Sequence, residues 1–301
     1  MINRAMRIGK SKDKTILNRR STSEKIVYPI ISVVFSLYAV TLLYPFIWMF
    51  INSLKGMVEY AVGDTFAFPE KWLFSNYVRA FEQLTLENGT TFFQMFFNSV
   101  WYTVLSTAIS VFASSVTGYC LAKYDFKAKK YMYAIAIFAM TIPIVGSNAA
   151  HLKLTKNLGI YDTPLYAVFS SMSAWGFNFL VMYGAFRSVS WTYAEATFID
   201  GGGHYSVFFR IMLPQMVGPM TTLFIMAAIT NWNDYMTMLM YMPSYPTIAS
   251  GLYSFQATAV RNINYPVYFA GLLVSMVPII VLFSLTANII MTNLSMGGLK
   301  G

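Results

Sequence analysis

Six long apolar segments follow one another along the chain, separated by shorter polar stretches. A helix rises about 1.5 Å per residue, so about 20 apolar residues cross the hydrocarbon core of a bilayer. The segments that reach this length are residues 26–51, 92–121, 131–150, 165–186, 215–241 and 267–291. The pattern predicts an all-α, polytopic membrane protein with about six transmembrane helices.

Prolines interrupt several of these segments without adding charge to them. They are Pro29, Pro45, Pro143, Pro219 and Pro278. In lipid, neighbouring helices satisfy the backbone groups that a proline frees, so we expect these residues to kink helices without ending them.

The chain is poor in charge for its length. Of its 301 residues, 56% are hydrophobic and 11% are charged, against about 25% charged in a typical soluble domain. Too few charges remain to cover a water-facing surface, so we expect membrane lipid to surround much of the chain. The formal net charge of +9 does not indicate a nucleic-acid partner, because the basic residues cluster beside apolar segments, as cytoplasmic anchors do.

Lysine and arginine are distributed unequally between the two sides that six spans create. With a cytoplasmic N-terminus, fifteen lie inside: eight before residue 26, four at 123–130, and Arg187, Arg210 and Lys300. Six lie outside: Lys55, Lys71, Arg79, Lys153, Lys156 and Arg261. The positive-inside rule therefore predicts a multi-pass protein of the cytoplasmic (inner) membrane with both termini in the cytoplasm.

This topology assigns a place to each part of the chain. A basic cytoplasmic tail (1–25) precedes the six-helix transmembrane domain (26–291), and a short cytoplasmic tail (292–301) follows it. Inside the transmembrane domain we expect an external cap at 52–91, a cytoplasmic loop at 187–214 and an external loop at 242–266.

The cytoplasmic loop has the pattern of a structured element. Thr192 precedes Glu195 by three residues, which is the spacing of a capping box that starts a helix. An apolar stripe follows, formed by Trp191, Ala194, Phe198 and Ile199. Gly201–Gly203 then ends the helix, a second helix is expected at 205–212, and Pro214 is placed to start the fifth span. From the residues alone, the result is either a membrane-surface anchor or a contact for another protein.

The same loop carries a longer motif. Glu195, Ala196 and Thr197 are followed after three further residues by Gly201, and after nine more by Ile211, Leu213 and Pro214. This resembles the EAA motif of permease subunits of binding-protein-dependent ABC importers, with Thr197 in place of the third motif residue and Ser190 where many relatives carry proline. We call residues 187–214 the EAA segment.

The resemblance extends beyond the EAA segment. The stretches at 72–81 (WLFSNYVRAF), 231–235 (NWNDY) and 297–301 (GGLKG) are similar to the carbohydrate branch of the family, and in particular to the maltose-type second permease. The resemblance implies import of an oligosaccharide, polyol or glycerol-phosphate-like solute. It also implies three partners, namely a second permease of similar fold, an ABC ATPase dimer and an extracytoplasmic solute-binding protein.

In this family the EAA segment docks on the ATPase and transmits its closing motion to the membrane helices. The resemblance places ATPase coupling on Glu195, Ala196, Asp200, Gly201, Ile211, Leu213 and Pro214. The chain has no G-x-x-x-x-G-K-[ST] sequence, so ATP is expected on the partner ATPase. We therefore expect a non-enzymatic subunit with no cofactor and no metal site of its own.

A polar group lies in the fifth apolar segment. Asp234 is the only acidic residue within the six segments, and Asn231 and Asn233 flank it closely. A charge at membrane depth costs at least about 2.5 kcal/mol, so these residues should face water or the protein interior. We expect them to line a translocation path, to form a hydrogen-bond network between helices, or to lie close to the outer surface.

The sequence fits two other classes of membrane protein less well, namely secondary transporters and membrane enzymes. A self-sufficient secondary transporter usually has ionisable residues at the midplane and inverted repeats, whereas this chain has one such aspartate and no visible repeat. A membrane enzyme needs a cluster of catalytic side chains in or beside the spans, and the sequence has none.

The orientation is testable by cysteine labelling. With Cys120, the single native cysteine, replaced, a membrane-impermeant thiol reagent should modify cysteines at Asn88 or Asn262 in whole cells. Cysteines at Ala128 or Gly202 should react only after lysis, because we place them in the cytoplasm. The reverse pattern would contradict the predicted orientation.

Overall fold

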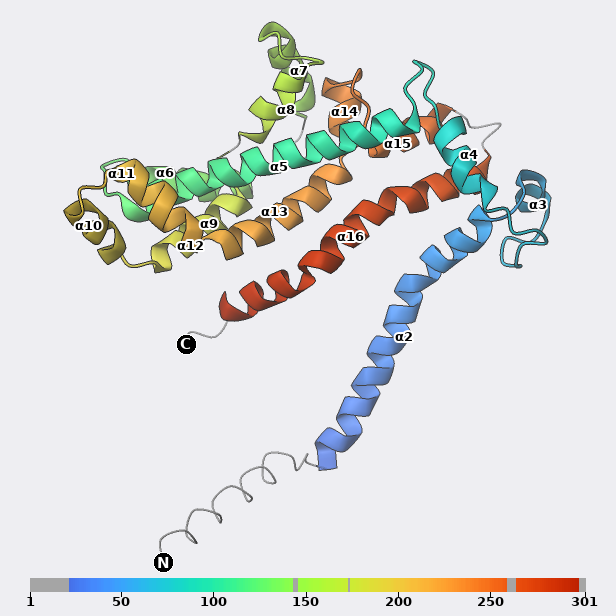
Figure 1. Ribbon diagram of the computed structural model, residues 1–301, viewed down its shortest axis with the longest axis horizontal. Helices are drawn as coiled ribbons and strands as arrows, with labels where there is room; N and C mark the ends of the chain where they lie inside the picture. The colour runs from blue at the N-terminus through green and yellow to red at the C-terminus, as the bar shows by residue number, and fades with distance from the viewer. Residues whose placement is uncertain (1–21, 143–145, 173, 259–263, 298–301) are drawn as a thin grey trace, which may run out of the picture.

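The computed structural model describes residues 22–142, 146–172, 174–258 and 264–297, and these residues form helices and connecting loops without a β-strand. The all-α fold class predicted from the sequence is confirmed. Three helices are much longer than the others: α2 (Thr22–Ser53), α5 (Phe92–Lys123) and α16 (Tyr265–Gly297). Figure 1 shows α5 running along the main body, with α13 (Val217–Trp232) and α16 on one side of it.

Helix α2 stands apart from the rest of the chain. It meets the body at one end and diverges from it along its length (Figure 1). None of the 18 residues in its most apolar window is buried within the chain. Its apolar surface is therefore left for lipid or another subunit to cover.

The number of helices long and apolar enough to cross a membrane is smaller than the sequence pattern suggested. Among the described residues there are three, at Ile26–Ser53, Phe92–Lys123 and Tyr265–Ala287. A fourth is obtained by joining His204–Gln215 to Val217–Trp232 across a bend of 72°. The figure of about six spans thus stays a prediction, although the helical class does not depend on it.

Two of the expected continuous spans are broken. The segment 131–150 is covered by α6 (Lys129–Thr141) and α7 (Asn148–Asn157), and the segment 165–186 by α8 (Pro164–Ser171) and α9 (Phe177–Ser188). Gly146 has φ +81° and Gly176 has φ +129°. A positive φ cannot continue a right-handed helix, so a glycine at each break lets the chain turn.

The fifth expected span is also shorter than 215–241. Helix α13 ends at Trp232, and a separate short helix, α14 (Met236–Tyr241), follows the polar residues between them. The next segment, expected as an external loop, contains α15 (Ile248–Thr258). Its start is fixed to α5, because the Ile248 N–H donates to the Ser99 hydroxyl at 2.8 Å.

The prolines behave in more than one way. Pro29 and Pro45 lie inside α2 and Pro278 lies inside α16, so both helices continue through these prolines, as expected. Pro219 is the third residue of α13, where the backbone N–H of any residue lacks an intrahelical partner. Pro143 lies outside the described residues.

Residues 52–91 form a small folded region that contains two short helices, α3 (Met57–Val62) and α4 (Ser75–Gln83). The Lys55 side chain is buried and donates through Nζ to the Asp64 carbonyl at 2.9 Å. Asn76, also buried, donates to the Ser53 and Lys55 carbonyls. These bonds satisfy polar groups that would otherwise be costly to bury.

The most extensive helix pairing joins α5 to α9 and depends on Gly118 of α5. A Cβ at this position would lie 2.9 Å from the Tyr183 backbone nitrogen and 3.0 Å from the Met182 Cβ. Glycine therefore allows the two backbones to approach more closely than any other residue would.

This close approach predicts that Gly118→Ala lowers the stability of the purified protein in detergent. The added methyl group must push α9 away, and overpacking of this kind costs about 1–3 kcal/mol. Gly184→Ala on α9 is the matched control, because a Cβ there meets no heavy atom within 4 Å. A thermal midpoint that falls equally, or not at all, in both variants would contradict the assigned contact.

Candidate functional site

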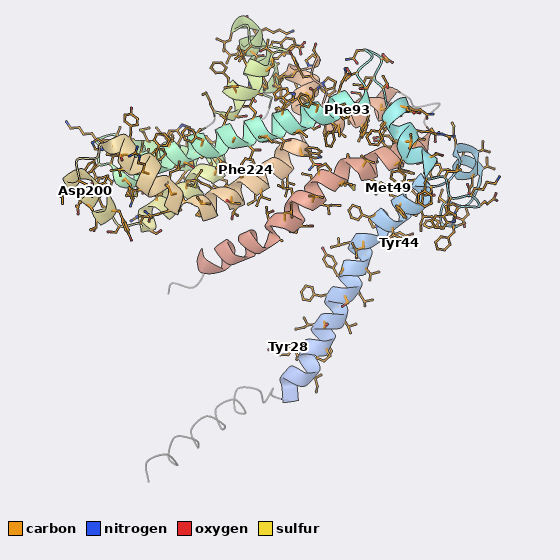
Figure 2. The ribbon with its side chains drawn as sticks, viewed as in Figure 1. Tyr28, Tyr44, Met49, Phe93, Asp200 and Phe224 are labelled. Atoms are coloured by element: carbon orange, nitrogen blue, oxygen red, sulfur yellow. The ribbon has the colours of Figure 1, made fainter. Side chains whose placement is uncertain are left out.

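The EAA segment lies at one end of the molecule. It comprises α10 (Thr192–Ile199), α11 (His204–Ser206), a π-helix at Val207–Met212 and α12 (Leu213–Gln215). Figure 2 places Asp200 at this end, opposite the end that carries α3 and α4. The segment is therefore far along α5 from the 52–91 region.

The expected capping box at the start of α10 is wrong. Thr192 is the first helical residue, and the N-cap position belongs to Trp191, whose carbonyl accepts the Glu195 N–H at 3.2 Å. The Thr192 N–H donates to the Ser190 hydroxyl at 3.3 Å. Because Thr192 already has a helical backbone, its hydroxyl does not serve as the acceptor that the motif requires.

The expected helix end at the glycines is correct. Gly201 has φ +80°, and its N–H donates to the Phe198 carbonyl at 3.0 Å, while the Gly202 N–H donates to the Thr197 carbonyl at 2.8 Å. This pair of bonds is a Schellman motif, in which a residue with positive φ ends the helix. Only a glycine adopts that conformation without strain.

The second half of the EAA segment differs from the expected α-helix. Residues 204–215 continue without interruption, but the Leu213 N–H reaches back five residues to the Phe208 carbonyl, as in a π-helix. Pro214 does not start the fifth span, because α12 bends by 72° into α13 after it. Pro214 lacks a backbone N–H, so it cannot supply the usual helical bond at this point.

One face of the EAA segment packs on the membrane helices. Ala194 is fully buried, and Trp191 and Phe198 are half-buried against the same apolar cluster as Tyr119 of α5. Ile199 was expected to continue this stripe, but it is 86% exposed. It points outward because α10 ends there and the chain turns away at Gly201.

Aromatic contacts and hydrogen bonds hold the segment to the end of α5. The Tyr119 ring lies 4.8 Å from the Phe208 ring, centroid to centroid. The Tyr124 hydroxyl is 2.9 Å from His204 Nδ1, and the Lys123 ammonium donates to the Val189 carbonyl. None of these residues was singled out from the sequence, since each becomes informative only when α5 and the loop are brought together.

The residues expected to couple to an ATPase occupy two environments. Glu195, Ala196, Asp200 and Gly201 are exposed on the outer side of α10, whereas Ile211 and Leu213 are half-buried and Pro214 is exposed. Exposure therefore separates the half-buried Ile211 and Leu213 from the other five residues. Tyr205 of α11 is a second large exposed side chain of the EAA segment, 82% exposed.

The polar group at the end of α13 is divided between two sides of the helix. The Asn231 side chain donates to the Thr107 hydroxyl of α5 at 3.0 Å. Asp234 also faces α5, where it accepts from the Tyr102 hydroxyl at 3.3 Å and from the Thr237 N–H at 3.0 Å. Asn233 is exposed and bonds within its own helix, to the Ile229 carbonyl.

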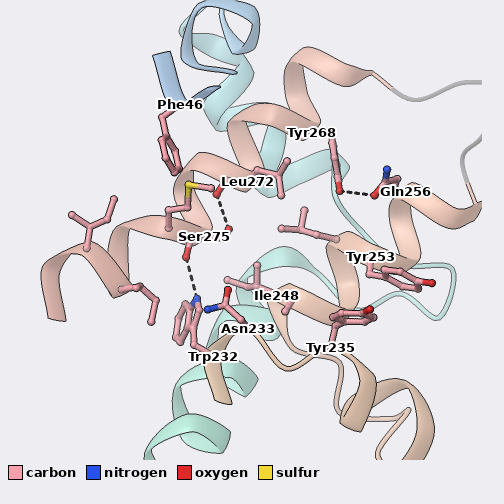
Figure 3. Close-up of a pocket in the computed structure, with 15 residues that line it drawn as sticks. Phe46, Trp232, Asn233, Tyr235, Ile248, Tyr253, Gln256, Tyr268, Leu272 and Ser275 are labelled. Atoms are coloured by element: carbon pink, nitrogen blue, oxygen red, sulfur yellow. Dashed lines mark hydrogen bonds between the residues drawn. The ribbon is translucent and has the colours of Figure 1, made fainter. Parts of the chain in front are cut away.

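Asn233 lines an open cavity of about 530 Å³ between the end of α13, α15 and α16, with Phe46 of α2 at its wall; we call it the aromatic cavity (Figure 3). The rings of Tyr235 and Tyr253 stack at 4.6 Å. The Trp232 indole N–H donates to the Ser275 carbonyl at 3.1 Å, closing one side. This volume is within the range of small-molecule sites in proteins.

Asn231 lines a second cavity of about 460 Å³, which we call the serine cavity. Its walls come from α5, from α8 and α9, and from α13 and α14. They carry many hydroxyl groups, contributed by Tyr102, Ser106, Ser110, Tyr166, Ser170, Ser171, Thr230 and Thr237. Ser106 is 1% exposed, and its hydroxyl has no hydrogen-bond partner in the part of the chain that the structure describes.

Comparison with known proteins assigns the family. Residues 114–296, more than half of the chain, match the model of the binding-protein-dependent transport system inner membrane component. The chain belongs to this family, which confirms the resemblance inferred from the EAA motif. It is similar to a solved chain of a bacterial ABC transporter for the acidic polysaccharide alginate, with a TM-score of 0.75, 20% identity, and coverage of 89% of this chain and 98% of that one.

Curated relatives cover most of the chain. The probable ABC transporter permease protein YurM of Bacillus subtilis is 29% identical, over 88% of this chain and 86% of its own length. The arabinooligosaccharides transport system permease protein AraQ of the same organism is 26% identical, over 89% and 94%. The diacetylchitobiose uptake system permease protein NgcG of Streptomyces coelicolor is 24% identical, over 87% and 85%.

The Schellman motif predicts that alanine destabilises the helix end at Gly201 and has no effect at Gly203. Gly201→Ala should loosen the end of α10 by about 1 kcal/mol, because alanine is strained at positive φ. Gly203→Ala is the control, since Gly203 has φ −94° and open space around its Cα. Hydrogen exchange of the 192–203 backbone should accelerate only in Gly201→Ala, and equal exchange in both variants would contradict the motif.

Proposed function

We propose that this protein is the translocation subunit of an ATP-driven importer of carbohydrate in the cytoplasmic membrane, with both termini in the cytoplasm. Membership in the inner membrane component family supports the transport role. The names of AraQ, NgcG and the melibiose/raffinose/stachyose import permease MelC support saccharides as the solute class. The relatives include importers named for neutral saccharides and, in the alginate transporter, for an acidic one.

Three partners complete the transporter in this proposal. An extracytoplasmic solute-binding protein delivers the solute, as the alginate transporter is described in complex with a periplasmic protein. A second permease of similar fold covers surfaces that this chain leaves open, including the exposed length of α2. A separate ATPase dimer binds ATP, because this chain has no P-loop sequence.

Coupling to the ATPase rests on one observation about the EAA segment: its two faces differ. The inner face is fastened to α5 through Tyr119, Tyr124 and Lys123. The outer face presents Ile199, exposed and beside the carboxylates of Glu195 and Asp200. An exposed apolar side chain at a rigid helix end suits insertion into a groove, and the carboxylates suit basic groups around it.

The translocation path runs beside α13 in this proposal. Polar side chains within an apolar helix bundle are costly unless they meet water, a ligand or each other. Asn231 and Asp234 are partly satisfied by α5, while Asn233 lines the aromatic cavity. We assign the path to the two cavities on either side of α13, with the serine cavity as the more polar wall.

The docking role of Ile199 is tested by Ile199→Glu. A carboxylate in place of the exposed apolar side chain should prevent its insertion into a groove of the ATPase, so co-purification of the ATPase and solute uptake should both fall at least tenfold. Glu195→Lys should weaken retention for the separate reason of charge reversal. The level of the protein in the membrane should stay normal in both variants, because both positions are exposed.

Val62→Glu is the matched control for a new charge at an exposed apolar position. Val62 is 85% exposed and lies in α3, within the 52–91 region rather than the EAA segment. It should leave ATPase retention unchanged. Wild-type retention and uptake in Ile199→Glu would contradict the coupling role, whereas the family assignment would stand.

A further inference from the structure

The serine cavity has a chemical character that the family assignment does not specify. Three side chains of α5 at intervals of four residues, Tyr102, Ser106 and Ser110, form one wall. Successive intervals of four residues place them on a single face of the helix. The hydroxyl of Ser106 is buried beside the cavity and lacks a hydrogen-bond partner among the described residues, so its hydrogen-bonding capacity is unused there.

Aromatic and amide groups complete the lining. Tyr166 and Phe177 come from α8 and α9, and Asn178 donates to the Ser110 hydroxyl at 3.5 Å. Hydroxyl and amide groups exchange hydrogen bonds with sugar hydroxyls, while aromatic rings offer an apolar face to the carbons of a sugar ring. A small number of placed polar groups among apolar ones is typical of small-molecule sites.

Charge distinguishes this cavity further. Among the described residues that line it there is no lysine, arginine or histidine. The carboxylate of Asp234 adjoins the cavity, because it accepts hydrogen bonds from two lining residues, the Tyr102 hydroxyl and the Thr237 backbone N–H. Two donors and no cation leave a negative potential at this end of the cavity, and sites that hold anions normally supply basic side chains.

We propose that the serine cavity holds an uncharged, polyhydroxylated part of the solute and that Asp234 disfavours anionic solutes there. This rests on the proposed transport function and narrows its solute class to neutral saccharides or polyols, away from uronic acids, sulfonated sugars and glycerol phosphates. Asp234 is thus a specificity-determining residue.

The experiment probes the cavity with two small thiol reagents of opposite charge and similar size, the trimethylammonium-ethyl and sulfonato-ethyl methanethiosulfonates. Thr230→Cys, at an exposed position that lines the cavity, is placed on a Cys120→Ala background in the assembled transporter, in right-side-out and in inside-out membrane vesicles. Both reaction rates are divided by the rates for a free thiol in solution. Neither reagent needs the solute-binding protein, so the readout reports on the cavity and not on solute delivery.

After division by the free-thiol rates, the cationic reagent should react about fivefold faster than the anionic one, or more. A preference of this size is expected from one carboxylate whose charge is partly screened by solvent. Asp234→Asn, which keeps one acceptor oxygen, should remove the preference, and Asp234→Glu should retain it. Retention of the ATPase by each variant verifies assembly.

Three results would overturn the inference. Equal rates, or faster reaction of the anionic reagent, would contradict the negative potential. A preference that persists in Asp234→Asn would remove Asp234 as its source. No reaction from either side of the membrane would take the cavity off the translocation path. None of these results would affect the test of the EAA segment at Ile199.

Discussion

The structure depends on the attachment of the EAA segment to the C-terminal end of α5. Tyr119 lies at the centre of this attachment, buried and in contact with the rings of Tyr124, Phe186 and Phe208. Each aromatic pair contributes about 0.5–1.5 kcal/mol beyond its burial. Together with the close backbone approach at Gly118, these contacts join α5, α9 and the EAA segment into one packed unit.

This unit gives a physical account of coupling. A force applied at the exposed tip of α10 is transmitted through the buried face of the segment and not through a flexible loop. The π-helix and the 72° bend then direct the chain from the EAA segment into α13, whose far end carries the residues beside both cavities. Packed interfaces move as rigid bodies and do not deform gradually, so displacement of the segment is expected to reposition α5 and α13 together.

Much of the fold was predictable because the strongest signal in a membrane protein is a long apolar run. The runs that became α2, α5 and α16 were located to within a few residues, and the helix-ending glycine at Gly201 was identified correctly. Local signals were less dependable. The same Thr-x-x-Gln/Glu spacing forms a capping box at Thr91, where it starts α5, and none at Thr192.

The difference between the two sites lies in the backbone conformation of the threonine. Thr91 has an extended conformation and can receive the Gln94 N–H, whereas Thr192 is already inside the helix that Trp191 begins. The outward direction of Ile199 and the division of Asn231 from Asn233 were unpredictable for a related reason. Both depend on where a helix ends and which neighbour it meets, and the apolar pattern does not encode either.

The account is tested most directly by the distance between spin labels at Val104 on α5 and Thr192 on α10, both exposed positions, in the assembled transporter. The distribution is measured by pulsed electron paramagnetic resonance without nucleotide and after trapping with ATP and vanadate, with loss of hydrolysis verifying the trapped state. The account predicts the same distance peak in both states, because α5 and the EAA segment move as one unit. A peak that shifts by several ångströms on trapping would show that the segment moves independently of α5 and would contradict the central claim.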